Sequence, residues 1–118
     1  IAREKKLNLP SKKGSLVIQL SLWLEGQLPE GEPLLKDAAA QYNMSERSLQ
    51  RRLGEESLTW NQLVERTRRT LVERHLKISG TTVTQLAFLL GFSDVSSFSR
   101  AFKKWYGISP SQFRYKDP

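Results

Sequence analysis

The chain has 118 residues and a mass of 13.6 kDa, which is enough for one domain with a single substantial core. A hydrophobic share of 38% with 26% charged residues describes a globular chain rather than a disordered or membrane-embedded one. The lack of cysteine excludes disulfides, thiolate metal sites and cysteine nucleophiles, and a single histidine leaves no zinc cluster. We therefore expect no cofactor, no metal and no enzymatic activity.

The charge of the chain is strongly basic and unevenly distributed. Nineteen Lys and Arg residues against twelve Asp and Glu residues give a net charge of +7. Residues 14–44 are net acidic, whereas residues 1–13 and 45–118 carry the basic excess. Such a balance indicates a polyanionic partner, with nucleic acid as the leading candidate. No signal peptide and no apolar run near the ~20 residues of a membrane span are present, so we expect a cytoplasmic protein without a membrane partner.

Periodic apolar residues predict an all-α fold of about seven helices, and no stretch alternates like a strand. The expected helices lie, in chain order, at residues 15–26, 34–42, 45–54 or 45–56, 59–79, 82–90, 94–106 and from 109 onwards. The expected N-caps are Ser45, Thr59 (with Gln62 in a capping box), Thr82 or Thr81, Asp94, and Ser109 followed by Pro110. Residues 1–13 show no apolar period and are expected to be a linker from a missing domain, or else a frayed terminus.

The pattern of residue types from residue 35 to 53 recurs from residue 83 to 102. A shift of 48 residues relates the two copies through the first helix and the turn, and a shift of 49 relates their second helices. In each copy an alanine permits close helix crossing, an asparagine or glycine tolerates a left-handed turn, and a large apolar residue anchors the second helix. The sequence therefore predicts a helix-turn-helix twice. The corresponding pairs are Ala39 and Ala87, Asn43 and Gly91, Ser45 and Asp94, Leu49 and Phe98, and Arg51 and Arg100.

The outward faces of the two second helices are polar and mostly basic, and Arg and Gln are the side chains that read guanine and adenine edges in the major groove. The helix expected at residues 59–79 connects the two copies. Its 21 residues would span about 30 Å, close to the ~34 Å between successive major-groove faces on one side of B-DNA. The outward residues are Arg47, Ser48, Gln50, Arg51 and Arg52 in the first copy, and Ser96, Ser97, Ser99, Arg100, Lys103 and Lys104 in the second.

Several motifs occur together in this chain: Leu86-Ala87, Gly91-Phe92-Ser93-Asp94, Ser97 through Lys104, Gly107-Ile-Ser-Pro110 and Phe113-Arg114. Together they resemble the signature of AraC/XylS-type transcription regulators, and Met44-Ser45, Leu49 through Leu53 and Arg68 are similar to the first half of that family. The resemblance covers roughly residues 16–116. It implies two helix-turn-helix subdomains, at residues 14–58 and 80–118, joined by a linker helix at 59–79. They would bind two major-groove segments on one face of double-stranded DNA.

The resemblance also implies roles for single residues. Family members usually carry a second domain for ligand sensing or dimerisation, commonly N-terminal, and residues 1–13 would be the end of that linker. Base reading falls on Arg47, Gln50 and Arg51 in the first half, and on Val95, Ser96, Ser97 and Arg100 in the second. We expect phosphate contacts from Ser48, Arg52, Ser99, Lys103 and Lys104.

Three departures from the family pattern stand out. The family commonly has a glycine before the linker helix, but residues 55–58 have none, and Ser57 stands closest to that position. Val72 stands where a small alanine is usual. Val95 and Ser96 stand where polar readers such as Gln often occur, so we expect more apolar readout there, for instance a contact from Val95 to a thymine methyl group.

Each functional interpretation has a structural alternative. Arg51 and Arg100 are either base readers, solvated helix residues, or partners of Glu55 and Asp94. Arg68 either contacts DNA or buttresses the fold. The chain as a whole is either a DNA-binding domain or a helical protein–protein interaction module, for instance one that contacts RNA polymerase. We expect the large aromatic residues to form the core instead of a base-stacking platform: Trp23, Trp60, Phe88, Phe92, Phe98, Phe102, Trp105 and Phe113.

Overall fold

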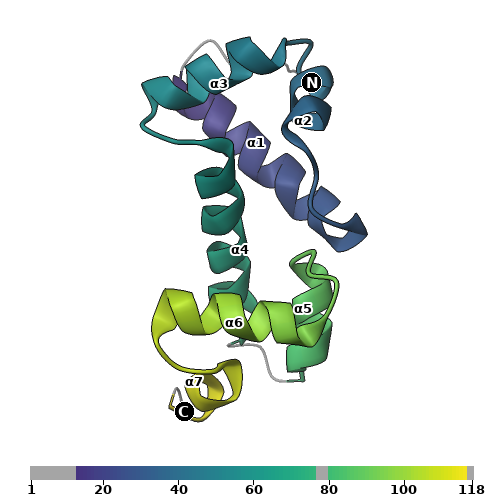
Figure 1. Cartoon of the computed structure of the whole chain (residues 1–118), viewed down its shortest axis with the longest axis vertical. Coiled ribbons are helices and arrows are strands. Elements are labelled where there is room, and N and C mark those ends of the chain that lie inside the picture. The colour runs from purple at the N-terminus through teal and green to yellow at the C-terminus, as the bar shows by residue number, and fades with distance from the viewer. Residues whose placement is uncertain (1–12, 77–79, 117–118) are drawn as a thin grey trace, which may run out of the picture. The chain divides into compact units, whose positions relative to one another are not determined.

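The computed structural model describes residues 13–76 and 80–116, and within these ranges the chain forms seven α-helices, one short 3-10 helix and no strand (Figure 1). The predicted all-α class is therefore confirmed. No helix in the described part is long and apolar enough to cross a membrane. Residues 1–12 of the expected linker, and Ser79 at the expected end of the connecting helix, lie outside the described residues. The elements are α1 (Lys13–Gln27), η1 (Leu28–Glu30), α2 (Leu35–Gln41), α3 (Glu46–Glu55), α4 (Trp60–Leu76), α5 (Val83–Leu89), α6 (Val95–Tyr106) and α7 (Pro110–Lys116).

The chain divides into two compact units, each with its own core, instead of the one domain with a single core that its length suggests, and the division falls inside α4. The first unit contains α1 up to Gly26 and the segment Pro33–Thr67, with α2, α3 and the start of α4. The second unit contains the segment Gln27–Glu32 and the chain from Arg68 onwards, with α5, α6 and α7. The second unit thus includes η1, although η1 lies between two helices of the first unit in the sequence.

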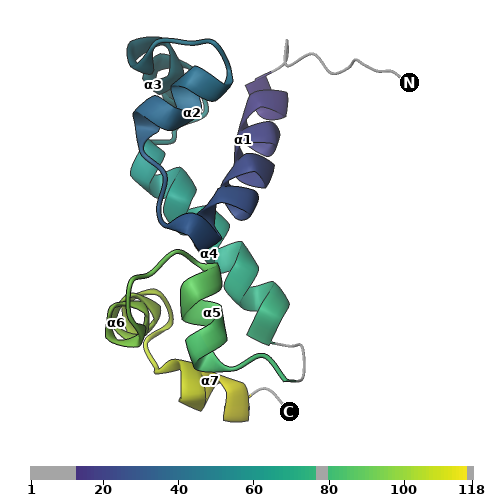
Figure 2. The ribbon, with the colours of Figure 1, turned by 90° about the vertical axis from the view of Figure 1, so that its right-hand side faces the viewer.

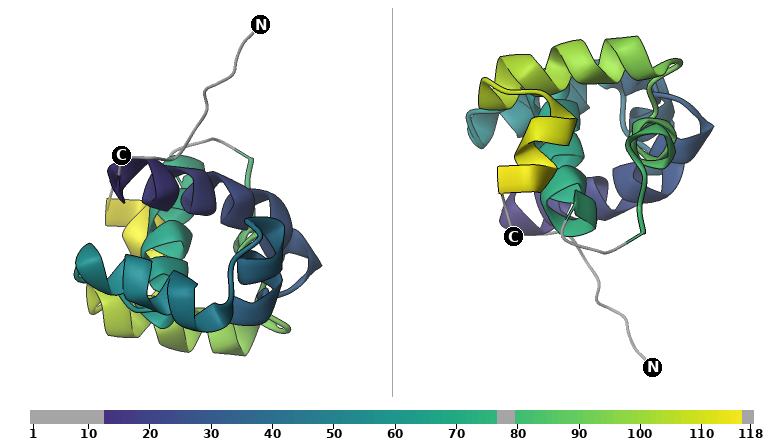
Figure 3. Two further views of the ribbon diagram at one scale, coloured as in Figure 1. Left: turned by 90° about the horizontal axis from the view of Figure 1, so that it is seen from above. Right: turned by 90° about the horizontal axis from the view of Figure 1, so that it is seen from below.

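Each unit contains one helix-turn-helix. α2 and α5 have seven residues each and pack on α3 and α6, respectively. In the second unit, α5 and α6 cross steeply: Figure 2 shows α6 nearly end-on beside α5 seen lengthwise, and Figure 3 (right) shows the reverse. The predicted small residues lie at these contacts, since Ala39 and Ala87 are 2% and 0% exposed.

The two turns repeat each other in detail, as the sequence predicts. Asn43 has a φ of 56° and Gly91 a φ of 85°, so both take the left-handed conformation. The Met44 N–H donates to the Ala39 carbonyl at 2.9 Å, and the equivalent bond 48 residues later measures 3.1 Å. This six-residue closure is the usual end of a helix at a left-handed residue, and it fixes where each second helix begins.

The predicted caps are confirmed. The Ser48 N–H donates to Ser45 Oγ at 3.0 Å at the start of α3, and the Ser97 N–H donates to Asp94 Oδ1 at 2.7 Å at the start of α6. The start of α4, the start of α5 and the start of α7 carry reciprocal bonds between residue pairs three apart: Thr59 with Gln62, Thr82 with Gln85, and Ser109 with Gln112.

The core of the first unit is built mainly from leucines, valines and alanines, and the core of the second unit adds buried phenylalanines. In the second unit the Phe98 and Phe102 rings are fully buried, with centroids 5.8 Å apart. The prediction for Phe88 was wrong, because this side chain is 51% exposed. Phe88 follows the buried Leu86 by two residues, which turns it about 200° around the helix and away from the core. The other expected core aromatics are half-buried: Trp23, Trp60, Phe92, Trp105 and Phe113.

α1 and α3 both continue past the glycine that was a candidate for ending the helix. α1 begins at Lys13 and continues past Gly26 to Gln27, because the chain runs on into the 3-10 turn of η1. α3 continues through Gly54 to Glu55, and Ser57 then takes a φ of 61°. The Leu58 N–H donates to the Leu53 carbonyl at 3.0 Å, so Ser57 occupies the left-handed position where a glycine is most often found.

Replacing Ser57 by glycine is expected to stabilise the chain. A side chain in the left-handed conformation costs about 1 kcal/mol, which Ser57→Gly relieves, whereas Ser57→Ala keeps the strained Cβ. Urea denaturation should therefore give a larger free energy of unfolding for Ser57→Gly than for the parent, and no gain for Ser57→Ala. A glycine variant less stable than the alanine variant would contradict the assignment.

The N-cap of α6 has a consequence for pH dependence. The hydrogen bond from the Ser97 backbone N–H, with further support from the Ser97 hydroxyl, lowers the pKa of Asp94 below its ordinary value of 3.8. A carboxyl whose pKa is lower in the folded state stabilises the fold above its unfolded pKa, and this stabilisation disappears as the pH falls through the folded pKa.

Asp94→Asn tests this effect, because asparagine also caps a helix but does not titrate. The difference in free energy of unfolding between the parent and Asp94→Asn should be constant above about pH 5, and it should shift in favour of the variant as the pH falls below about 4. Denaturation series at several pH values measure this difference in free energy of unfolding. Because all other carboxyls are present in both proteins, their titration cancels in the difference. A difference that stays constant from pH 6 to pH 3 would refute a charged cap.

Candidate nucleic-acid interface

The exposed face of α3 gathers the three residues predicted to read bases in the first half. Arg47, Gln50 and Arg51 are all exposed, whereas Leu49 and Leu53 are fully buried. Because successive helix residues turn by about 100°, residues three and four apart share a face, and the three polar side chains lie on the side opposite the leucines. The helix therefore presents one polar, basic face to solvent.

The two residues of α3 with predicted phosphate contacts lie nearer the buried side of the helix. Ser48 is half-buried, and its hydroxyl is hydrogen-bonded with that of Ser45 at 3.0 Å. Arg52 is half-buried and already has contacts within the chain. Both lie beside the buried side of the helix, so they border the exposed face instead of forming its centre.

α6 presents a matching face in the second unit. Ser96, Arg100 and Lys103 are exposed and follow one another at intervals of four and three residues. Lys104 is exposed beside them, and Ser99 is half-buried at the edge. The buried Phe98 and Phe102 occupy the opposite side, as Leu49 and Leu53 do in α3. The face therefore consists of hydroxyls and cations, and α6 has no acidic residue in its first turn.

Two of the predicted base readers on α6 are less exposed. Val95 and Ser97 are both half-buried at the start of the helix. Arg100 Nη2 donates to Ser97 Oγ at 3.3 Å, which orients the guanidinium along the exposed face. Val95 lies about 100° from Ser96, beside the apolar side of the helix.

The two arginines at the centres of these faces occupy equivalent places. Arg51 and Arg100 are each the sixth residue after the N-cap of their helix, Ser45 and Asp94, and both are exposed. The repeat that the sequence predicts therefore extends from the backbone to the outward side chains. A guanidinium at this position has the donors for a bidentate contact to guanine.

Arg68, by contrast, points into the protein. Its side chain is 11% exposed, its Nε–H donates to the Leu90 carbonyl at 2.7 Å, and its Nη1 lies 3.0 Å from Glu32 Oε1. Burial lowers the pKa of the Arg68 guanidinium, and the nearby Glu32 carboxylate counteracts this effect. Of the two alternatives left open by the sequence, these contacts favour a buttress.

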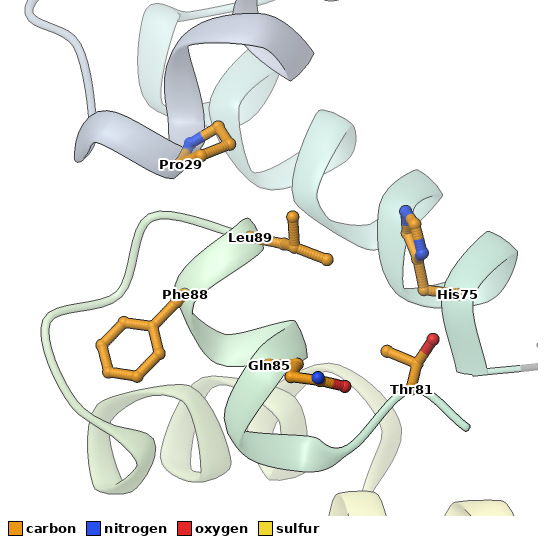
Figure 4. Close-up of a pocket in the computed structure, with 6 residues that line it drawn as sticks. All are labelled: Pro29, His75, Thr81, Gln85, Phe88 and Leu89. Carbon is orange, nitrogen blue, oxygen red and sulfur yellow. The ribbon is translucent and has the colours of Figure 1, made fainter.

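A hollow in the second unit was not predicted from the sequence. Its volume is about 530 Å³, and Figure 4 shows Leu89 pointing into it opposite His75. Phe88 lines the hollow, but this residue was expected in the core, so nothing in the sequence indicated the hollow. None of the twelve residues predicted to contact DNA lines this hollow. Its lining residues are Pro29, His75, Thr81, Gln85, Phe88 and Leu89.

Comparisons with known proteins agree with this arrangement. A family model described as a helix-turn-helix domain matches residues 38–116. The HTH-type transcriptional regulator VirS of Mycobacterium tuberculosis is 40% identical over 87 residues, which cover 74% of this chain and 26% of VirS. The chain thus matches only about a quarter of the length of this curated relative.

Solved structures share the fold. An AraC-type regulator from Chromobacterium violaceum aligns with a TM-score of 0.75 at 19% identity, over 89% of this chain and 96% of its own. The DNA-binding domain of AdpA, solved in complex with a target DNA, aligns with a TM-score of 0.72 at 23% identity, over 85% of this chain and 90% of its own. With the match to the family model, the chain belongs to the helix-turn-helix domain family, and its fold is that of AraC-type DNA-binding domains.

Proposed function

We propose that α3 and α6 are two recognition helices that enter adjacent major-groove segments of one DNA duplex. The observation that carries this proposal is the repeated exposed face, with Arg51 and Arg100 at equivalent places opposite a buried apolar stripe. The helix-turn-helix subdomains would correspond to residues 14–58 and 80–118, with the linker helix within 59–79. The 17 described residues of α4 span about 26 Å, the same order as the ~34 Å helical turn of DNA.

The proposed contacts follow from the chemistry of each face. The Arg and Gln side chains of α3 and Arg100 of α6 would donate to base edges. The hydroxyls of Ser96 and Ser97 would hydrogen-bond to donor or acceptor groups on the base edges. Val95 would contact a thymine methyl group. Lysines and hydroxyls at the edges would bind phosphates and set the register. The base-reading set is Arg47, Gln50, Arg51, Val95, Ser96, Ser97 and Arg100, and the phosphate set is Ser48, Arg52, Ser99, Lys103 and Lys104.

We further propose that the whole protein carries a second domain for ligand sensing or dimerisation and acts in the cytoplasm. The match to only 26% of VirS supports the first of these. A protein partner such as RNA polymerase is supported by Ile18 and Leu22 of α1, which are 62% and 63% exposed and lie one helical turn apart.

A protein-interaction role without DNA binding makes a different prediction. Titration of a labelled random-sequence duplex at low salt separates the two functions, because a DNA-binding domain also binds non-specific duplex through its cations. A binding curve that weakens steeply as salt is added supports the proposed function. An absence of binding at low salt would leave only the interaction module.

Alanine substitutions at the two equivalent arginines should each weaken binding to a duplex selected from a random pool. We expect Arg51→Ala and Arg100→Ala to lose about 1–3 kcal/mol each, because a bidentate contact to guanine is lost. Each variant should relax the base preference at different positions of the site. Lys36→Ala is a control that removes an exposed cation from α2. Equal losses in all three variants would show only a general charge effect.

A further inference from the structure

A largely buried arginine of α4 stands where the first half of the chain has a leucine. The 48-residue shift that relates α2 to α5 also pairs Leu20 of α1 with Arg68 of α4. Leu20 is fully buried, and the Arg68 side chain is 11% exposed. Burying a cation costs free energy unless a counter-charge and hydrogen-bond acceptors compensate for the lost water. The partners of Arg68 therefore indicate which role it has that a leucine could not fill.

The partners of Arg68 include three successive residues of the turn between α5 and α6. Its Nε–H donates to the Leu90 carbonyl at 2.7 Å, and its guanidinium carbon lies 4.2 Å from the centroid of the Phe92 ring. Its Nη2 lies 3.4 Å from the place that a Cβ on Gly91 would occupy. The guanidinium therefore contacts the turn through a hydrogen bond, a ring face and close packing at once.

The segment between α1 and α2 contacts both Arg68 and the turn between α5 and α6. Glu32 Oε1 lies 3.0 Å from Arg68 Nη1. Leu28 of η1 is fully buried, and its carbonyl oxygen lies 2.7 Å from the position of a Cβ on Gly91. Only a glycine fits the turn at this approach, so the segment 27–32 and the turn are packed against each other without spare room.

The turn between α5 and α6 also contacts α6, the proposed recognition helix. The Phe92 ring lies 5.6 Å from the Phe98 ring and 6.4 Å from the Trp105 ring, centroid to centroid, and both of these belong to α6. Asp94, the N-cap of α6, follows Phe92 by two residues. A shift of the turn would therefore move the first turn of α6, where the proposed base readers lie.

We propose that Arg68, held by Glu32, is a positioning residue that sets α6 for base reading without touching DNA itself. This inference rests on the proposed function of α6. The corresponding residue in the first half is Leu20, which has no charge or hydrogen-bonding group, so the DNA half-site read by α3 does not depend on such a pair. The two half-sites should therefore respond differently when the Arg68–Glu32 pair is lost.

The test compares three variants on one selected duplex. Arg68→Leu gives the second half the residue of the first, and Glu32→Gln removes only the counter-charge. Glu30→Gln is the matched control, because Glu30 is an exposed glutamate of η1 and its substitution changes the net charge equally. Affinities are measured for the selected duplex and for two duplexes with one half-site scrambled. The half-site whose preference is lost in Arg100→Ala is assigned to α6.

We expect Arg68→Leu and Glu32→Gln to lose about tenfold in discrimination at the half-site of α6, with the half-site of α3 unchanged. Glu32→Gln removes one negative charge, which by itself would tighten DNA binding, so a loss in this variant reports positioning. The salt dependence of log K should keep its slope in Arg68→Leu, whereas loss of a phosphate contact in Lys103→Ala should reduce that slope by about 0.9.

Discrimination equal to that of the parent in both variants would overturn the inference. Equal losses at both half-sites together with a lower melting temperature would also overturn it, since that pattern marks a general structural role. A reduced salt slope in Arg68→Leu would show direct contact with a phosphate instead. If Arg68→Leu does not fold, Glu32→Gln against Glu30→Gln decides. A parent chain without any sequence preference would refute the proposed function, and this inference with it.

Discussion

Burial of one apolar stripe on each second helix of the two helix-turn-helix motifs is the constraint on which the rest of the structure depends. Leu49 and Leu53 in α3, and Phe98 and Phe102 in α6, are fully buried. Once these side chains face the core, helix geometry turns Arg51 and Arg100 to solvent. The polar faces are thus a consequence of packing, although leucines anchor one helix and a cluster of aromatic rings anchors the other.

Features determined by local sequence were predictable. The side chain of an N-cap accepts a hydrogen bond from the backbone N–H only three residues further on, so Ser45, Asp94 and the reciprocal pairs are recognisable from residue types alone. Left-handed turns favour Gly and Asn, which identified Asn43 and Gly91. The repeat then placed the anchors and the outward faces, and the described structure has both copies. The roles of single residues on DNA stay predictions, because they depend on a partner that the chain alone does not contain.

Features determined by distant contacts were not predictable. Nothing near η1 in the sequence indicates that it packs in the second unit, and the match between Glu32 and Arg68 joins residues 36 apart in the chain. Phe88 was assigned to the core from its residue type, whereas its place on α5 opposite Leu86 decides its exposure. Ser57 was recognised as the nearest substitute for a glycine, but its left-handed conformation depends on the closing bond from Leu58 to Leu53.

The central claim is that one chain engages two major-groove segments with two recognition helices. Hydroxyl-radical footprinting of the chain on a duplex selected from a random pool tests this claim most directly. The account predicts two protected segments on one face of the duplex, with centres about 10.5 base pairs apart. A single protected segment, or protection at two places on opposite faces, would contradict it.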